Sequence, residues 1–445
     1  MKKVLILGAG LVVKPIVTYL LDNDYAVTVA SRTKSKADAM IKGHPNGTAV
    51  GWTTDDETAL EEMVSSHDLT VSLLPYAFHV KVANFCIRYQ KNMVTTSYVK
   101  PEMQALDEKA RKAGIIILNE IGLDPGIDHM SAMRIIDHVH NKGGRIEEFY
   151  SLCGALPAPE YADNPFKYKF SWSPKGVVMA GNNDGKYIKK GREVYVPTED
   201  LFKDVFEVDF PQVGTLQVYP NRDSVQYIDI YDIPEAKTMF RGTFRYPGWC
   251  EALDAMKEMK LITYDKISLK GKTYADMVAF LIGSGNSDHI RKQAADYLGI
   301  DEKSHAMEAL AWLGVFDQTP VGRDSDSPFE VVSDLMLEKM ALSEEEKDMV
   351  VMMHVFLAAY PDGSKEVIKS RLLDFGSPAT DTSVARTVAL PAAIAVKMIL
   401  EGKINIAGVY RPVLPEIYNP VLDALETIDI RMIEEYGLPE SSHIQ

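Results

Sequence analysis

The chain has 445 residues, of which 46% are hydrophobic and 25% are charged. Because this length exceeds the size at which one hydrophobic core usually divides, we expect two or three folded domains rather than a disordered chain. Its 48 basic and 63 acidic residues give a net charge of −15, which argues against a nucleic acid or an anionic membrane surface as the main partner.

Short β-rich runs alternate with helical patterns over residues 1 to about 120, which is typical of βαβ units that build a parallel sheet. The expected strands are Val4–Leu7, Ala26–Ala30, Leu69–Leu74, Met93–Ser97 and Ile115–Leu118. Between them, apolar residues at helical spacing predict helices that begin near Val13 and Phe78, and Pro101 suits the first position of a third. The pattern predicts a Rossmann-type, doubly wound parallel sheet of the α/β class.

The composition changes after the turn at residues 122–126 and the helical pattern that follows it. Residues 145–248 are rich in Tyr, Phe, Pro and Gly, with strands expected at Ile146–Cys153 and Thr215–Tyr219, which indicates a mixed α+β domain. Residues 251–349 are rich in Met, Leu, Ala, Glu and Lys and predict a small helical domain.

Two further helices are expected near the C-terminus. The apolar segment 384–400 predicts one, and the other is expected to have Asn419 as its cap and Pro420 in its first position. The expected domains are residues 1–128 with 384–445 (Rossmann), 129–250 with about 350–383 (mixed α+β) and 251–349 (helical).

Cysteine usage and the apolar runs favour the cytoplasm. The three cysteines are odd in number and far apart, without the spacing of a zinc site or of a disulfide framework. The apolar run Val4–Leu7 is too short for the core of a signal peptide, and the segment 384–400 contains two basic residues. We therefore expect no secretion signal and no membrane span.

A glycine-rich turn, Gly8-Ala9-Gly10, follows the first expected strand and opens the first expected helix. Such a turn lets the backbone approach a pyrophosphate that is held at the helix N-terminus. Val13 stands where a third glycine is usual, so the fingerprint is incomplete, and an ordinary tight turn is the alternative interpretation. We expect Gly8 and Gly10 to bind a dinucleotide.

The end of the second expected strand favours NADP over NAD. An NAD enzyme places a carboxylate here against the ribose 2′-hydroxyl, but the segment Ser31-Arg32-Thr33 is followed by no acid until Asp38. Arg32 offers a planar guanidinium and its two neighbours offer hydroxyls, which together suit a 2′-phosphate. A solvated turn is the alternative interpretation of these residues.

Several stretches within residues 1–250 resemble the saccharopine reductase family, the NADP-dependent, L-glutamate-forming saccharopine dehydrogenases. In chain order they are residues 72–76 (SLLPY), 95–98 (TTSY), 119–129 (NEIGLDPGIDH), 154–160 (GALPAPE), 168–174 (YKFSWSP), 219–224 (YPNRDS) and 241–246 (RGTFRY). The resemblance implies a homodimer of three-domain subunits. It also implies that C-terminal residues complete the Rossmann domain, and that the mixed domain binds substrate and forms the dimer.

The resemblance also implies the ligand contacts, residue by residue. The implied substrate contacts are Ser97, Tyr98, Asp124, Arg222, Thr243, Phe244 and Arg245. The implied cofactor contacts, with NADP as the cofactor, are Gly10, Leu11, Val12, Val13, Ser31, Arg32, Thr33, Leu74, Pro75, Ser97, Leu123, Asp124, Pro125 and Trp172. Two residues depart from the family pattern, Ala9 where relatives often have serine, and Arg411, an arginine that the family does not lead us to expect.

The implied substrate makes chemical sense of these residues. Saccharopine carries three carboxylates and two nitrogens, so a protein with a net charge of −15 must gather cations at one place to bind it. We expect Arg222 and Arg245 to bind carboxylates and Arg241 to be structural, although each could instead be a surface or fold-stabilising arginine. We assign Asp124 and Tyr98 as the catalytic pair, Asp124 holding the charged substrate nitrogen and Tyr98 a hydrogen bond or proton relay. Asp124 could instead only shape its turn.

The expected reaction is the reversible NADP(H)-dependent conversion of L-saccharopine and water into L-glutamate and L-2-aminoadipate 6-semialdehyde, by way of an imine. His79 and His129 are expected to be hydrogen-bonding or surface groups, and no metal site is expected. The alternatives are a related imine reductase, such as carboxynorspermidine synthase, and a non-catalytic NADP-sensing protein.

Overall fold

The computed structural model describes residues 1–172 and 174–444 of the chain, which divides into two compact units. Unit 1 comprises Met1–Arg145, Ala358–Ser364 and Ile368–Tyr436. Unit 2 comprises Ile146–Leu357, Lys365–Val367 and the residues from Gly437 onward.

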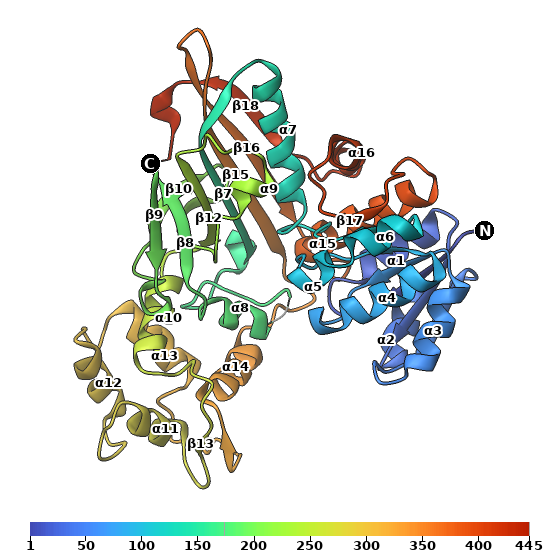
Figure 1. The fold of residues 1–445 in the computed structure, drawn as a ribbon. Coiled ribbons are helices and arrows are strands. Elements are labelled where there is room, and N and C mark those ends of the chain that lie inside the picture. The colour runs from blue at the N-terminus through green and yellow to red at the C-terminus, as the bar shows by residue number, and fades with distance from the viewer. Residues whose placement is uncertain (173, 445) are drawn as a thin grey trace. The chain divides into compact units, whose positions relative to one another are not determined.

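Unit 1 is built on a parallel sheet with the strand order β17-β6-β5-β4-β1-β2-β3. Figure 1 draws the N-terminal part of this unit in blue, with helices α1 to α4 labelled. Its strands are β1 (Lys3–Leu7), β2 (Ala26–Ser31), β3 (Gly47–Gly51), β4 (Leu69–Ser72), β5 (Asn92–Val94), β6 (Ile116–Leu118) and β17 (Gly408–Tyr410). The strand order reverses at β1, which pairs in parallel with β2 on one side and β4 on the other. In open α/β sheets this reversal is where ligands bind.

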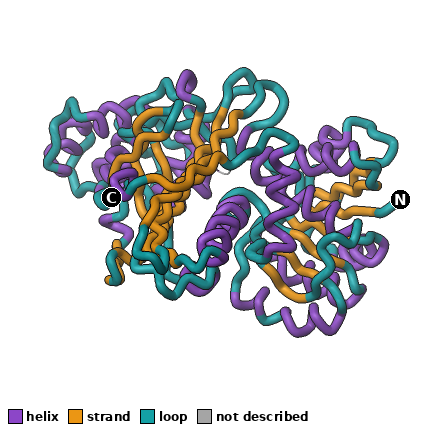
Figure 2. The backbone as a smooth tube through the Cα atoms, turned by 90° about the horizontal axis from the view of Figure 1, so that it is seen from above, coloured by secondary structure: helices purple, strands orange, loops and turns teal. Residues whose placement is uncertain are grey.

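Helices lie on both sides of these strands, as Figure 2 shows near the N-terminus. They are α1 (Lys14–Asp22), α2 (Lys34–Ile41), α3 (Glu57–Ser66), α4 (His79–Tyr89), α5 (Pro101–Gln104), α6 (Asp107–Ala113), α7 (Ile127–Asn141), α15 (Ser383–Leu400) and α16 (Pro415–Glu426). Helix α1 packs on α15, α3 on α4, and α7 on α16. The predicted Rossmann-type fold is confirmed.

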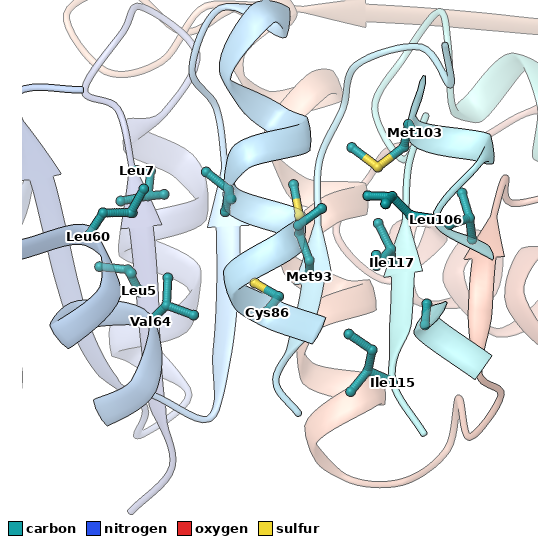
Figure 3. Close-up of a cluster of buried hydrophobic side chains, with 14 of the residues drawn as sticks. Leu5, Leu7, Leu60, Val64, Cys86, Met93, Met103, Leu106, Ile115 and Ile117 are labelled. Atoms are coloured by element: carbon teal, nitrogen blue, oxygen red, sulfur yellow. The ribbon is translucent and has the colours of Figure 1, made fainter. Parts of the chain in front are cut away.

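The core of unit 1 explains why its strands read as continuous apolar runs. All four residues Val4–Leu7 are fully buried, because helices cover both faces of the sheet. On one face, Leu5 and Leu7 pack with Leu60 and Val64 of α3 (Figure 3). The five strands predicted for this region are all present, and β3 is an additional edge strand that was not predicted.

C-terminal residues complete unit 1. Strand β17 pairs in parallel with β6, and helix α15 packs on α1. By length and composition α15 could also cross a membrane, but 72% of it is buried inside the protein, as in the core helix of a globular domain. The expected start of the last helix at Pro420 is wrong: α16 begins at Pro415, and Asn419 lies inside it, where its Oδ1 accepts a hydrogen bond from Arg134 Nε (3.1 Å).

The second large sheet of the chain is mixed and has the strand order β10-β11-β12-β7-β15-β16-β18, to which β8 and β9 attach through β12. Most of its strands belong to unit 2, whereas most residues of β16 and β18 fall within the bounds of unit 1. The strands are β7 (Arg145–Pro157), β8 (Gly185–Lys189), β9 (Arg192–Val196), β10 (Phe206–Phe210), β11 (Gly214–Pro220), β12 (Thr238–Arg245), β15 (Asp348–Ala359), β16 (Lys365–Phe375) and β18 (Ile433–Leu438). Strand β12 runs parallel to β7 and antiparallel to β11, so the predicted mixed character is confirmed.

The helices of unit 2 fall mostly between residues 249 and 339, as the composition indicated. They are α8 (Pro174–Ala180), α9 (Tyr227–Ile230), α10 (Trp249–Glu258), α11 (Tyr274–Leu281), α12 (Ile290–Leu298), α13 (His305–Leu313) and α14 (Pro328–Lys339), with a short pair of strands, β13 (Ile267–Ser268) and β14 (Ser325–Asp326). Here α10 packs on α13 and α8 on α14. The division into three domains stays a prediction.

Candidate functional site

The carboxyl ends of the parallel strands carry the predicted residues of unit 1. Gly8 follows β1, Arg32 follows β2 and Leu74 follows β4, while Ser97 and Asp124 follow β5 and β6. Because the strands are parallel, these ends lie along one edge of the sheet. The fold therefore brings together residues that are spread over more than a hundred positions of the sequence.

The glycine turn fits a dinucleotide. Gly8 has φ +113°, and a Cβ there would lie 2.8 Å from the Leu73 carbonyl oxygen, so the turn requires glycine. A Cβ on Gly10 would meet nothing within 4 Å, so the protein itself leaves this space open. Leu11 is 69% exposed, whereas Val13 is buried at the start of α1.

The N-terminus of α1 suits an anion such as the pyrophosphate. Its cap position, Val13, makes no side-chain capping hydrogen bond, and the first turn contains no acidic residue. Val13 N–H donates to the Gly10 carbonyl (3.2 Å) and Pro15 has no N–H, so the other N–H groups of the first turn are the ones that can bind a phosphate. Val12 lies half-buried in the turn that leads to them.

The end of β2 fits a 2′-phosphate. Arg32 is exposed and forms no ion pair within the part of the chain that the structure describes. Thr33 N–H donates to Ser31 Oγ (3.3 Å), which folds the segment into a turn. Asp38 pairs instead with Lys34 (3.1 Å), so no carboxylate of this turn opposes a phosphate beside Arg32.

Ser97, expected to contact both ligands, is held by a buried histidine. The His79 ring forms two hydrogen bonds. Its Nδ1 lies 2.8 Å from Ser72 Oγ, and its Nε2 lies 2.8 Å from Ser97 Oγ. Burial lowers the pKa of His79 to about 4, so the ring is neutral at physiological pH. His79 is therefore a hydrogen-bonding group at a helix start, as predicted.

A cavity of about 320 Å³ opens beside Tyr98 and is lined also by Tyr76, His79 and Lys100. Its size lies at the lower end of the range for small-molecule sites. Pro75 is exposed at the start of the segment that leads to this cavity, and Leu74 is half-buried.

The Asp124 turn is fixed by its own backbone. Gly122 N–H donates to the Pro125 carbonyl (3.0 Å), and a Cβ on Gly126, which has φ +149°, would lie 2.0 Å from the Gly122 oxygen. Leu123 and Pro125 are buried in this turn, while Asp124 is half-buried.

The predicted catalytic pair is in contact. The Tyr98 hydroxyl donates to Asp124 Oδ1 at 3.4 Å. This contact joins the segment after β5 to the turn after β6.

Glu120, His129 and Arg411 form a buried charged cluster that the sequence analysis did not assign. Glu120 is 2% exposed and accepts hydrogen bonds from His129 Nε2 (2.7 Å) and Arg411 Nε (2.9 Å). Its signals in the sequence were Arg411, which departs from the family pattern, and the position of Glu120 directly before the Asp124 turn.

In unit 2, Arg245 at the end of β12 is a buried cation without a counter-ion. It is 3% exposed, and its guanidinium carbon lies 5.0 Å from the Tyr168 ring centre, 5.4 Å from that of Trp249 and 5.8 Å from that of Tyr219. Its Nη1 donates to the Phe244 carbonyl (2.8 Å), but its Nε has no partner, and no carboxylate of the described residues pairs with it. Burying an unpaired charge is costly, so an anionic ligand fits here.

Other donors gather around Arg245 without hydrogen-bond partners among the described residues, namely Trp249 Nε1, Trp172 Nε1 and the Tyr168 hydroxyl. Burial raises the pKa of the Tyr168 hydroxyl, and Arg245 and Trp172 partly oppose that shift, so Trp172 lies close by although the pair misses hydrogen-bond geometry. Trp172, predicted as a cofactor contact, thus belongs to the aromatic cluster around Arg245.

The remaining predicted residues of unit 2 point in different directions. Thr243 shares its face of β12 with Arg245 and pairs with Tyr219 of β11. The Phe244 side chain points to the other face, where it is fully buried against Phe210 (5.9 Å between ring centres), away from the face that Thr243 and Arg245 share. Arg222 is exposed in the turn after β11.

Arg241 differs from Arg245 although both are 3% exposed on β12. Its guanidinium carbon lies 4.2 Å from the Tyr227 ring centre, and its backbone N–H donates to Ser224 Oγ (2.9 Å). These contacts tie β12 to the α9 segment and agree with the structural role expected for Arg241.

Comparison with known proteins gives whole-chain matches. Residues 4–118 match the family model of the saccharopine dehydrogenase NADP binding domain, and residues 122–430 match that of the saccharopine dehydrogenase C-terminal domain. The chain is 39% identical to the saccharopine dehydrogenase (NADP(+), L-glutamate-forming) of Schizosaccharomyces pombe, over 98% of this chain and 99% of that one. It is 37% identical to the mitochondrial alpha-aminoadipic semialdehyde synthase of Bos taurus, over 96% of this chain and 47% of that one.

A solved structure agrees with the fold. The apo histidine-tagged saccharopine dehydrogenase (L-Glu forming) from Saccharomyces cerevisiae matches with a TM-score of 0.90 and 36% identity. The match covers 98% of this chain and 100% of that one.

Gly10→Ala should separate cofactor binding from folding. Because its Cβ would meet nothing in the protein, the unfolding free energy should change by less than ~0.5 kcal/mol. The same Cβ would occupy the space left for the pyrophosphate, so NADPH affinity, measured by fluorescence titration, should fall at least about tenfold. Gly8→Ala is the control and should lower both quantities. Unchanged NADPH affinity in Gly10→Ala would show that the pyrophosphate lies elsewhere.

His79→Gln should reduce the loss of unfolding free energy that the protein shows as the pH falls. The unfolded chain protonates this histidine near its ordinary pKa of 6.5, but the folded protein does so only near 4, so wild-type stability falls as pH drops through that window. The contribution lost between pH 7.5 and 5 is about 2 kcal/mol. Urea unfolding of both proteins at the two pH values measures it, and an equal loss in the variant would contradict the assignment.

Proposed function

The chain belongs to the saccharopine dehydrogenase family, and we propose that it is an NADP-dependent, L-glutamate-forming enzyme of lysine metabolism. It converts L-saccharopine, water and NADP⁺ reversibly into L-glutamate, L-2-aminoadipate 6-semialdehyde, NADPH and a proton. The observation that carries this proposal is Arg245, a buried guanidinium without a carboxylate partner among the described residues. A substrate with three carboxylates supplies the missing anion.

Arg245 is suited to fix the substrate as well as to attract it. A guanidinium binds a carboxylate through two parallel hydrogen bonds, and its unpartnered Nε is one available donor. The surrounding rings exclude water, which strengthens the charge interaction. Arg222 contributes a second cation, and Thr243 a hydroxyl on the same face of β12 as Arg245.

On the cofactor side, Gly8, Gly10 and the start of α1 bind the pyrophosphate, and Arg32 with Ser31 and Thr33 binds the 2′-phosphate. Bound NADP supplies the acceptor for the hydride. The substrate carbon that loses the hydride becomes part of an imine, water adds to that carbon, and the carbon–nitrogen bond breaks to release glutamate.

Asp124 and Tyr98 serve the substrate nitrogen in this proposal. Asp124 holds the charged amine, and the Tyr98 hydroxyl, which donates to Asp124 Oδ1 at 3.4 Å, relays the proton that the nitrogen gains or loses. Ser97, which is hydrogen-bonded to neutral His79, orients the substrate and the cofactor.

The proposal extends to the setting of the enzyme. Its family resemblance supports a homodimer, and its free, buried cysteines, all three within the described residues, suit the reducing cytoplasm. A net charge of −15 is consistent with a small-molecule partner rather than with nucleic acid or a membrane.

Purified protein should reduce NADP⁺ when saccharopine is added. The assay follows absorbance of NADPH and compares saccharopine with lysine, glutamate and carboxynorspermidine. Turnover with carboxynorspermidine alone would favour the related imine reductase, and NADP⁺ binding without turnover of any of these would favour a sensing protein.

Arg245→Met should raise KM for saccharopine at least about 100-fold, because a charge-assisted carboxylate contact is lost. The same change removes a buried unpaired charge, so the unfolding midpoint without ligand should stay equal or rise. Steady-state kinetics and thermal unfolding measure the two effects.

Arg241→Met is the matched control, because it alters an arginine of equal exposure on the same strand. It should lower stability through the lost packing on Tyr227 and change KM less than about threefold. A higher KM in Arg241→Met than in Arg245→Met would show that Arg241 binds the substrate and that Arg245 is structural.

A further inference from the structure

We propose that Glu120 and Arg411 form a positioning pair that sets Tyr98 and Asp124 for the reaction. This inference rests on the proposed function, because it assigns a role in the same site. Neither residue is placed to touch the substrate in it; each acts through the backbone segments that carry the catalytic pair.

The Glu120 carboxylate is buried and fully partnered. Its Oε1 accepts hydrogen bonds from Arg411 Nε (2.9 Å) and from the Val99 backbone N–H (2.7 Å), and its Oε2 accepts one from His129 Nε2 (2.7 Å). Burial opposes ionisation, but the hydrogen bonds from His129 and Val99 and the charge of Arg411 outweigh it and keep the pKa of Glu120 below its usual value. The cluster is therefore a fixed ionic centre.

These contacts enclose Tyr98 on both sides in the chain. The Glu120 backbone N–H donates to the Ser97 carbonyl (3.1 Å), while its side chain accepts from Val99 N–H. Tyr98, which lies between these two anchored residues, has little freedom to move its Cα. The Tyr98 hydroxyl is thereby held in position to donate its hydrogen bond to Asp124.

The same carboxylate anchors the Asp124 side. Glu120 lies four residues before Asp124, and His129 lies in the first turns of α7, the helix that the Asp124 turn opens. Glu120 itself adopts φ +56°, a left-handed conformation that non-glycine residues rarely hold without support. The side-chain contacts of Glu120 supply that support.

Arg411 comes from the far end of the sequence and completes the centre. It follows β17, which pairs with β6 directly before the Glu120 segment. Removing its charge would leave Glu120 buried with one cationic partner fewer, so the segments on either side of the catalytic pair would relax.

The test compares Arg411→Gln with Arg386→Gln. Arg386 pairs with Asp374 at 3.6 Å, and the exposures of that pair, 24% and 4%, closely match the 24% and 2% of Arg411 and Glu120. Arg411→Gln should lower kcat with saccharopine at least tenfold and leave KM for NADP⁺ within twofold. Arg386→Gln should leave kcat within twofold, even where it lowers the unfolding midpoint.

Arg411→Lys restores the charge without the planar fork and should recover most of the lost kcat, staying two- to fivefold below wild type. An Arg411→Gln enzyme with kcat within twofold of wild type, or an equal loss in Arg386→Gln, would overturn the inference. If Arg411→Gln does not fold, an Arg411→Lys enzyme with wild-type kcat overturns it. Absence of saccharopine turnover in the wild type would instead refute the proposed function itself.

Discussion

The parallel pairing of strands around β1 is the constraint on which the function of unit 1 depends. Strands β2 and β4 both pair in parallel with β1, so each connection must cross back through a helix and each new loop starts at the same edge. Burial of Val4–Leu7 on both faces fixes that edge, and the close approach of the Leu73 carbonyl makes Gly8 obligatory there. The fold thus fixes where the residues after the strands lie, and their side chains determine what can bind there.

In the proposed function, the ligands bind at arginines that no carboxylate of the described residues neutralises. In a chain of net charge −15, Arg32 and Arg245 nevertheless have no carboxylate partner among the residues that the structure describes. For Arg245 the aromatic rings offset part of the cost of burial, and the same dry surroundings would strengthen its attraction for the proposed substrate carboxylate. At Arg245, the buried unpaired charge lowers stability without ligand but raises affinity for the proposed ligand. Glu120 differs, because its buried charge is hydrogen-bonded to Val99, His129 and Arg411.

Local patterns predicted the buried strands and the amphipathic helices of unit 1, because each element buries its own apolar residues. They missed β3, a short edge strand bounded by Gly47 and Gly51 with little apolar signal. The rule that favours proline at a helix start applies equally to Pro415 and Pro420, and burial of Ile417 and Tyr418 on the core side selects the earlier start. The resemblance supplied the proposed substrate residues, but the two-residue period of β12 turns Phe244 into the core, away from the face that Thr243 and Arg245 share.

The contacts that no local pattern predicts are those that join distant segments. Glu120 and Arg411 are 291 residues apart, and neither a buried glutamate nor a C-terminal arginine indicates its partner by residue type. Register supplies the missing information: β17 pairs Tyr410 with Leu118, so the residues that follow each strand must lie side by side at the functional edge. The hydrogen bond from Asn119 N–H to the Tyr410 carbonyl (2.9 Å) continues this register one step further. The C-terminal strand therefore does more than complete a sheet, because its register delivers a guanidinium to the carboxylate on which Tyr98 and Asp124 depend.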